Sequence, residues 1–250
     1  MRFKDRDILV TGGSGALGRR VLEQMQREGG RVTVIARAPV DGRNTLVGDL
    51  STAHGLETVA AAVAGRPWDL LVNIAGIQHF GPLEQQTPEH LLASYMVNLI
   101  APARLAQAVL PGMKGRGRGQ IANVGSIFGS INFAHFATYS SAKAGMRALS
   151  QSLRRELTGT GIDVTYVAPR AVATPFNSDR VNEFARLTGM AVDDPDRIAR
   201  RIVAAIRKNR RDVYLGFPEA LFVRLNAVAP GLIDGALKSN DLKARALFAG

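Results

Sequence analysis

The sequence predicts an α/β fold in which one parallel sheet of seven strands is covered by helices on both faces. Short apolar runs alternate with helical stretches from the first residues to about residue 216, an alternation typical of doubly wound sheets. The 250 residues are 46% hydrophobic and 21% charged, which suits one globular domain with a substantial core. No repeat, linker or low-complexity tract interrupts the sequence, so we expect a single domain over residues 1–250.

Seven apolar runs are expected to form the strands, because buried parallel strands are apolar along their whole length. They lie at Ile8–Thr11, Arg31–Ala36, Thr45–Gly48, Leu70–Ile74, Gln120–Gly125, Asp163–Val167 and Asp212–Leu215. Two long helices are predicted between them. One runs from about Leu91 to Leu110. The other follows Ser140 and has an apolar side with spacings of four and three, at Ala142, Met146, Leu149, Leu153 and Leu157.

The C-terminal residues 218–250 are expected to form a helical extension beyond the last strand. Their apolar stripe comprises Leu221, Phe222, Leu225, Val228, Leu232 and Ile233, with an interruption at Pro230 and Gly231. One interpretation is an amphipathic segment that docks on a membrane surface or walls the pocket of a lipid-like substrate. The other, which we favour, is an extra helix packed on the domain or on a second subunit.

Composition excludes several classes of function. The chain has no cysteine, so it has no disulfide, thiolate metal site or cysteine nucleophile, and its four histidines lack metal-ligand spacing. The net charge of +11 includes basic runs at residues 114–119 and 207–211. No aromatic residue is interleaved with them for base stacking, so we predict an anionic small ligand and no nucleic-acid partner. Without an apolar signal region or a long apolar run, a cytoplasmic protein is expected, with peripheral membrane contact left open.

A glycine-rich turn between the first strand and the first helix predicts a dinucleotide site. Glycines at such a place let backbone N–H groups approach a pyrophosphate, whose charge also suits a helix N-terminus. The site is therefore expected to have a Rossmann-type arrangement. The turn residues expected to bind the cofactor are Gly12, Ser14, Gly15, Ala16, Leu17 and Gly18.

The end of the second strand favours NADP(H) over NAD(H). Arg37 lies 19 residues after Gly18, and no acidic residue occurs from position 29 through 40. An acidic residue there would bind the ribose 2′-hydroxyl, whereas an arginine accepts a 2′-phosphate. The alternative for Arg37 is a solvated loop charge.

Tyr139 and Lys143 are the candidate catalytic pair. Positions i and i+4 share one face of a helix, so both side chains can address one point. An ammonium beside a phenol favours the phenolate, and we therefore expect Tyr139 to have a lowered pKa and to exchange a proton with a carbonyl or alcohol near neutral pH. Ser126 lies thirteen residues before the tyrosine.

Together these residues resemble the short-chain dehydrogenase/reductase family, in its compact subgroup of about 250 residues. The resemblance implies a catalytic tetrad of Asn98, Ser126, Tyr139 and Lys143. It also implies cofactor contacts through Arg37, Asp49, Leu50, Asn73, Ala75, Gly76, Tyr139, Lys143, Pro169, Val172 and Thr174, and a substrate lid over residues 174–195. The family is oligomeric, so a homodimer or homotetramer through helices near 91–112 and 140–158 is implied as well.

The mechanism implied is the reduction of a carbonyl, or its reverse. NADPH gives a hydride to the carbonyl carbon while Tyr139 protonates the oxygen, and Ser126 hydrogen-bonds that oxygen. Lys143 lowers the tyrosine pKa and binds the nicotinamide ribose. Asn98 positions Lys143 through a water. Apolar residues expected around the substrate favour a hydrophobic ketone, such as a 3-oxoacyl thioester; they are Ile127, Phe128, Phe133, His135, Phe136, Phe176 and Phe184.

Three substitutions within the motifs depart from the family pattern. Ala16 replaces a glycine of the turn, and Ile74 replaces the second asparagine of an Asn-Asn-Ala-Gly motif. Arg170 replaces the glycine after Pro169, and we expect it to contact the cofactor pyrophosphate or a substrate anion, or else to face solvent. Two other functions remain open: a non-catalytic NADP-binding regulatory protein, and an epimerase that retains its cofactor, which would fit the Gly12, Gly15 and Gly18 spacing.

Overall fold

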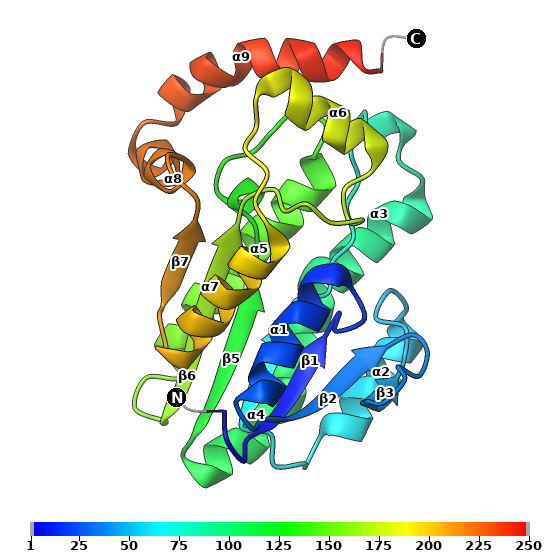
Figure 1. Cartoon of the computed structure of the whole chain (residues 1–250), viewed down its shortest axis with the longest axis vertical. Helices are drawn as coiled ribbons and strands as arrows, with labels where there is room; N and C mark the ends of the chain where they lie inside the picture. The colour runs from blue at the N-terminus through cyan, green and yellow to red at the C-terminus, as the bar shows by residue number, and fades with distance from the viewer. Residues whose placement is uncertain (1–2, 249–250) are drawn as a thin grey trace.

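One seven-stranded parallel sheet forms the centre of the molecule, as predicted. The computed structural model describes residues 3–248, and over that range the strand order is β3-β2-β1-β4-β5-β6-β7 (Figure 1). The strands are β1 (Asp7–Thr11), β2 (Arg31–Ala36), β3 (Asn44–Val47), β4 (Leu70–Asn73), β5 (Gly119–Val124), β6 (Ile162–Pro169) and β7 (Asp212–Leu215). The order reverses between β1 and β4, and at such a switch point the carboxyl ends of parallel strands leave a crevice for a ligand.

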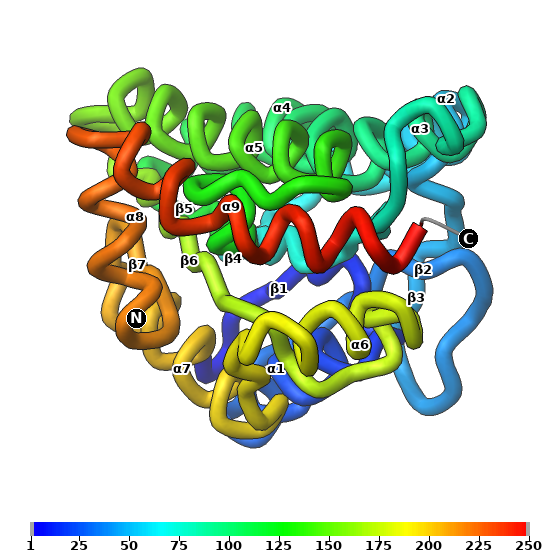
Figure 2. Tube along the Cα trace, turned by 90° about the horizontal axis from the view of Figure 1, so that it is seen from above, coloured from blue at the N-terminus to red at the C-terminus, as the bar shows by residue number. Residues whose placement is uncertain are grey.

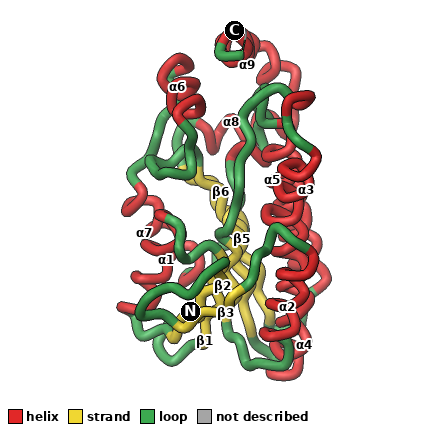
Figure 3. Tube along the Cα trace, turned by 90° about the vertical axis from the view of Figure 1, so that its right-hand side faces the viewer, coloured by secondary structure: helices red, strands yellow, loops and turns green. Residues whose placement is uncertain are grey.

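Helices cover both faces of this sheet (Figure 3). α1 (Ala16–Arg27) and α7 (Pro195–Arg207) lie on one face, and α2 (Ala53–Val63), α4 (Ala101–Arg116) and α5 (Ala137–Glu156) lie on the other. Successive strand residues point to opposite faces. Ile8 and Val10 therefore belong to the core under α1 and α7, whereas Leu9 belongs to the core under α2 and α4.

The predicted helix from Leu91 to Leu110 is not one regular α-helix. α3 (Pro88–Tyr95) is followed by a π-helical turn at Met96–Ile100, after which α4 continues. The other predicted helix, α5, begins before Ser140, at Ala137, and so includes Tyr139 in its first turn. π-Turns often redirect a side chain at a functional site, and Asn98 lies in the middle of this one.

Beyond the carboxyl edge of the sheet, three helices are built from residues after β6. α6 (Asp179–Thr188) precedes α7, and the C-terminal extension forms α8 (Glu219–Val228) and α9 (Pro230–Ala246). Seen from above, α9 runs between α5 and α6 (Figure 2). Within residues 3–248, no helix combines the length and apolar character needed to cross a membrane.

The apolar stripe predicted for the extension is divided between two environments. Ile233 is buried and, with the half-buried Leu225, packs in a core cluster that contains Met146 and Tyr166. The other four residues are exposed: Leu221, Phe222, Val228 and Leu232. The extension therefore packs on the domain through part of the stripe only.

Candidate active site

The glycine turn places backbone at the switch point between β1 and β4. Gly12 has a φ of +69°, and a side chain there would lie 2.7 Å from the backbone nitrogen of Ala75. A side chain at Gly18 would lie 2.1 Å from the Gly12 carbonyl oxygen. The Thr11 hydroxyl accepts hydrogen bonds from the backbone N–H groups of Ile74 and Ala75, both at 3.1 Å. The turn is thus packed tightly against the loop that follows β4.

The N-terminus of α1 is suited to an anion. Its N-cap residue, Gly15, has no side chain with which to cap the helix, and no acidic residue occupies the first turn. Both Ser14 and Gly15 are exposed. Unsatisfied N–H groups and the positive end of the helix dipole attract a phosphate at such a place. Ala16 is the first residue of α1 and lines the cleft, so its side chain does not block this end of the helix.

A cleft of about 810 Å³ extends along the carboxyl edge from this turn. Most residues predicted to bind the cofactor line it: the turn residues, Arg37, Asp49, Leu50, Ala75, Gly76, Tyr139, Lys143, Pro169, Val172 and Thr174. Asp49 accepts hydrogen bonds from the backbone and hydroxyl of Ser51, at 2.9 and 2.7 Å. These bonds, and the charge of Arg37, hold the pKa of that carboxyl below its usual value.

Asn73 is the exception among the predicted cofactor contacts. Its side chain is buried and donates a hydrogen bond to Asn123 Oδ1 at 2.8 Å. Asn123 in turn donates to the hydroxyl of Ser150 at 2.9 Å. Because this chain of bonds ties β4 to β5 and α5, Asn73 supports the sheet beneath the cleft and does not line it.

Ser126, Tyr139 and Lys143 meet in the inner part of the cleft. Ser126 follows β5 and its hydroxyl accepts a hydrogen bond from the Phe128 N–H at 3.1 Å. Ser126 lies close enough to Tyr139 for hydrogen bonding to act toward a lower pKa of the tyrosine. Lys143 lies one turn after Tyr139 on α5; its Nζ is 5.7 Å from the centre of the tyrosine ring and donates to the Val124 carbonyl at 3.3 Å.

Asn98 lies behind this group and is completely buried. Its Nδ2 donates to the Ile77 and Ser94 carbonyls, at 2.8 and 2.9 Å. Its Oδ1 has no hydrogen-bond partner among the described residues. A methyl group placed on Gly76 would lie 3.0 Å from Asn98 Oδ1 and 3.6 Å from Lys143 Nζ. The two polar atoms therefore border one small space.

The sequence profile of the family described as short chain dehydrogenase matches residues 6–184. The chain belongs to the short-chain dehydrogenase family. A putative ketoacyl reductase of Streptomyces coelicolor is 31% identical to it over 221 residues, covering 81% of this chain and 85% of the relative. The ketoacyl reductase HetN of a Nostoc strain is 28% identical over 230 residues, covering 83% and 77%. A solved structure of a short-chain dehydrogenase from Sphingobium yanoikuyae, in complex with NADPH, is 26% identical with a TM-score of 0.78, covering 92% of this chain and 95% of that one.

In this short-chain dehydrogenase, the expected lowering of the Tyr139 pKa is wrong. Burial raises the pKa of Tyr139 to about 12, and the hydrogen bond with Ser126 offsets only part of that effect. Burial also lowers the pKa of Lys143 to about 8. Both groups are dehydrated, and a dehydrated site disfavours the charged form of each. At neutral pH the site thus holds a protonated phenol beside a largely protonated amine.

The expectation for Arg170 also needs correction. Arg170 lines the cleft, but its guanidinium does not project freely into solvent. It is bound to the carboxylates of Asp193 and Glu219, and its side chain is only 16% exposed. Sequence patterns could not indicate this, because the partners lie 23 and 49 residues further along the chain.

At the substrate end, four of the seven predicted aromatic and apolar residues line the cleft: Phe128, Phe136, Phe176 and Phe184. Ile127 instead packs with Tyr166 in a separate core cluster, since the short 3-10 turn Ile127–Gly129 directs adjacent side chains apart. Phe133 and His135 do not line the cleft. Phe133 instead stacks on Phe128, with ring centres 4.6 Å apart.

Sequence reasoning missed two residues of the site. Arg19 is exposed on the first turn of α1 and lines the same cleft as Arg37. Tyr166 on β6 is fully buried, and its hydroxyl lies 3.4 Å from the carbonyl oxygen of Ser126, to which it donates a hydrogen bond. Gly125 leaves room for this hydroxyl, since a side chain there would lie 2.3 Å from it, and no local sequence pattern links the two positions.

Proposed function

We propose that this short-chain dehydrogenase is an NADPH-dependent reductase of hydrophobic carbonyl compounds. The observation that carries the proposal is one continuous cleft. It begins at the glycine turn and Arg37, and it contains Ser126, Tyr139 and Lys143 further along. A dinucleotide in such a cleft would extend from an anion-binding helix end to a proton donor.

The residues fit a phosphorylated dinucleotide. The uncapped start of α1 suits the pyrophosphate. Arg37 suits a 2′-phosphate, and the exposed Arg19 lines the same cleft. The bound NADPH of the Sphingobium yanoikuyae relative supports this preference. When bound, NADPH supplies a hydride to the carbonyl carbon.

The chain's own residues then handle the proton. Tyr139 gives its hydroxyl proton to the carbonyl oxygen, while the Ser126 hydroxyl donates a hydrogen bond to the same oxygen. The Lys143 ammonium stabilises the phenolate that Tyr139 becomes. A water between Asn98 Oδ1 and Lys143 Nζ would connect the amine to a proton source, which gives the orphaned oxygen of Asn98 a partner.

The lining at the inner end favours a hydrophobic substrate. Phe128, Phe136, Phe176 and Phe184 supply aromatic walls beside Tyr139. Aromatic walls with a few placed polar groups suit a bulky apolar ketone better than a free sugar. The relatives described as ketoacyl reductases support a 3-oxoacyl thioester as one such compound.

We also expect a cytoplasmic homodimer or homotetramer that assembles through α4 and α5. Leu92 and Ile100, at the start of this layer, are 64% and 44% exposed. Multi-angle light scattering measures the assembly directly, and a monomeric mass at micromolar concentration would contradict it.

A panel of carbonyl compounds tests the function. Purified protein should oxidise NADPH in the presence of acyl, steroid or aryl ketones, and sugars should be poor substrates. Tyr139→Phe should lose about 10²- to 10⁴-fold in kcat while it keeps its affinity for NADPH, because it lacks only the acidic hydroxyl. If NADPH binds but no carbonyl in the panel is reduced, or if sugars alone are reduced, the proposal is wrong.

A further inference from the structure

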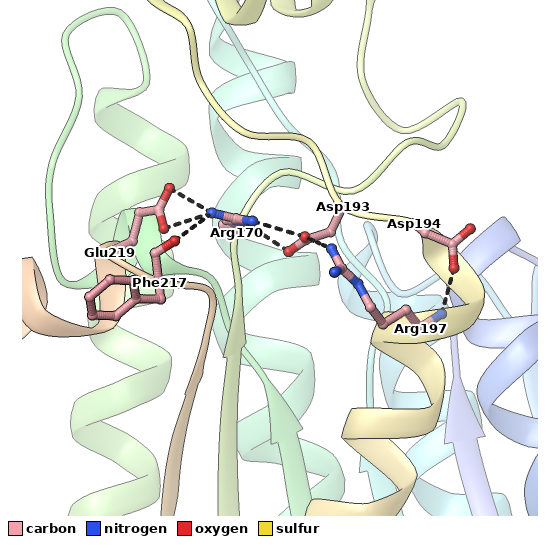
Figure 4. A network of polar contacts seen from close by, with 6 residues as sticks. All are labelled: Arg170, Asp193, Asp194, Arg197, Phe217 and Glu219. Atoms are coloured by element: carbon pink, nitrogen blue, oxygen red, sulfur yellow. Dashed lines mark hydrogen bonds and ion pairs between the residues drawn. The ribbon is translucent and has the colours of Figure 1, made fainter.

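Arg170 is the first residue after β6, and its side chain joins two carboxylates from distant parts of the chain (Figure 4). Its Nε and Nη2 donate to the two oxygens of Asp193, at 2.9 and 3.0 Å. Its Nη1 donates to the two oxygens of Glu219, at 2.8 and 3.0 Å, and to the Phe217 carbonyl at 3.3 Å. The guanidinium fork is thus engaged on both sides, a geometry that lysine cannot reproduce.

Asp193 ties the base of the segment 174–195 to β6. Its side chain is 2% exposed and also pairs with Arg197 of α7. Its N–H donates to the Ala171 carbonyl at 2.8 Å, and its own carbonyl accepts from Ala173 at 3.0 Å. The beginning and the end of the segment are therefore held together at one place.

Glu219 ties the C-terminal extension to the same place, because it is the first residue of α8. The chain that leads to it passes close to Arg170. Gly216 has a φ of +123°, and a side chain there would lie 2.8 Å from the Arg170 Cδ. The path into the extension therefore needs glycine where it crosses the arginine.

The two segments also meet at their far ends. The Lys243 Nζ of α9 donates to the Leu187 carbonyl of α6 at 3.0 Å. Ala244 of α9 is fully buried in a cluster that contains Phe184 of α6. The guanidinium of Arg180 lies 5.3 Å from the centre of the Phe248 ring. The extension and the segment 174–195 thus contact each other directly between α9 and α6, and they are joined a second time through Arg170.

We propose that Arg170 is a positioning residue that makes the segment 174–195, the expected substrate lid, and the C-terminal extension close over the substrate as one unit. The inference rests on the proposed function only in taking the cleft beside Phe184 as the substrate end. Arg170 acts through the two segments and not on the reacting atoms, since its donors are taken by Asp193 and Glu219. It controls how firmly substrate is enclosed and leaves the chemistry at Tyr139 unchanged.

Two carboxylates explain why an arginine is used here. Asp193 is buried, and a buried carboxylate is costly unless it is paired and hydrogen-bonded. Arg170 and Arg197 together balance the charges of Asp193 and Glu219. An apolar side chain at position 170 would therefore break both connections at once, whereas loss of Glu219 would break only the connection to the extension.

The test compares Arg170→Met, Arg170→Lys and Glu219→Gln in the full-length chain. The matched control is Arg186→Met, because Arg186 lies on α6 but pairs with Glu183 of the same helix, at 2.7 and 2.9 Å. Amide hydrogen exchange of α6 and α9 is measured without cofactor, which makes this arm independent of the activity. Substrate KM and kcat are measured with NADPH and the best ketone.

We expect Arg170→Met to speed exchange in both α6 and α9 and to raise substrate KM about tenfold with kcat nearly unchanged. Arg170→Lys should give exchange rates and a KM between those of Arg170→Met and the wild type. Glu219→Gln should speed exchange in both helices. Arg186→Met should change neither the exchange rates nor the KM. Exchange that changes only near residues 170 and 193, or a loss confined to kcat, would overturn the proposal. If Arg170→Met does not fold, Arg170→Lys and Glu219→Gln decide. If no ketone is reduced at all, the proposed function is wrong. The exchange measurement still tests whether Arg170 couples the segment 174–195 to the C-terminal extension.

Discussion

Asn98 Oδ1 and Lys143 Nζ border the same small space beside Gly76, although they come from different elements of the fold. Asn98 is carried by the π-turn before α4, and Lys143 by α5. The Asn98 oxygen has no partner among the described residues, while its nitrogen is fixed by two backbone carbonyls. A buried acceptor that is rigidly held and left unpaired indicates a place for an ordered water.

Gly76→Ala tests that water. The added methyl would lie 3.0 Å from Asn98 Oδ1 and would occupy the space that the water needs. We expect kcat to fall by about 10-fold or more, because general acid–base chemistry loses its proton supply. Because Gly76 also lines the cleft, NADPH affinity is measured by fluorescence titration and should fall less than kcat. Gly115→Ala is the control, since an added side chain there meets open space within α4. An unchanged kcat in Gly76→Ala would rule out the relay.

The pH dependence of reduction should follow Lys143. Reduction uses Tyr139 as the phenol, and its pKa of about 12 keeps that form at every ordinary pH. It also uses Lys143 as the ammonium, whose pKa is about 8. We therefore expect the rate of reduction to be level at lower pH and to fall as the pH rises through about 8, in single-turnover measurements with saturating NADPH. The reverse oxidation should instead speed up at higher pH. A level rate of reduction up to pH 10 would contradict this assignment.

Lys143 should lower the free energy of unfolding at neutral pH. Its pKa falls from 10.5 in the unfolded chain to about 8 in the folded state, so the folded state disfavours the ammonium. The difference corresponds to about 3 kcal/mol at neutral pH. Lys143→Met should remove most of that cost and raise the free energy of unfolding, at the expense of activity.

The difference in the free energy of unfolding between Lys143→Met and the wild type should decrease as the pH rises. The unfolded wild-type chain binds more protons between pH 8 and 10.5, so the wild type gains stability as the pH rises through that window. The advantage of Lys143→Met should therefore shrink there. Chemical denaturation at pH 7 and pH 10 measures it, with Lys114→Met, a change at an exposed lysine, as the control. A destabilised Lys143→Met at pH 7 would show that its bond to the Val124 carbonyl outweighs dehydration.

Arg37→Asp should change the cofactor preference. An aspartate at the end of β2 repels a 2′-phosphate and can accept hydrogen bonds from the ribose hydroxyls of NADH. We expect the NADPH Kd to rise about 10- to 100-fold, as for the loss of one charged hydrogen bond, and NADH binding to be maintained or improved. Arg200→Asp makes the same charge change on exposed α7 outside the cleft. Equal weakening of both cofactors in Arg37→Asp would mean that Arg37 does not discriminate between them.

Local patterns in the sequence determined the fold and the position of its central chemistry. The alternation of strands and helices predicted the parallel sheet, and the turn from Thr11 to Gly18 predicted the start of the cleft. Tyr139 and Lys143 could be paired from their spacing alone, because one helical turn separates them. In each case the relevant interaction spans only a few residues, so periodicity and backbone chemistry are sufficient.

The tertiary structure decided what depends on distant partners and on exclusion of water. Asn73 faces Asn123, and Arg170 binds Asp193 and Glu219, because separate elements pack against each other there. The pKa of Tyr139 is raised and not lowered, since dehydration outweighs the effect of the hydrogen bond with Ser126. Burial is a property of the assembled layers, and no spacing within one helix encodes it.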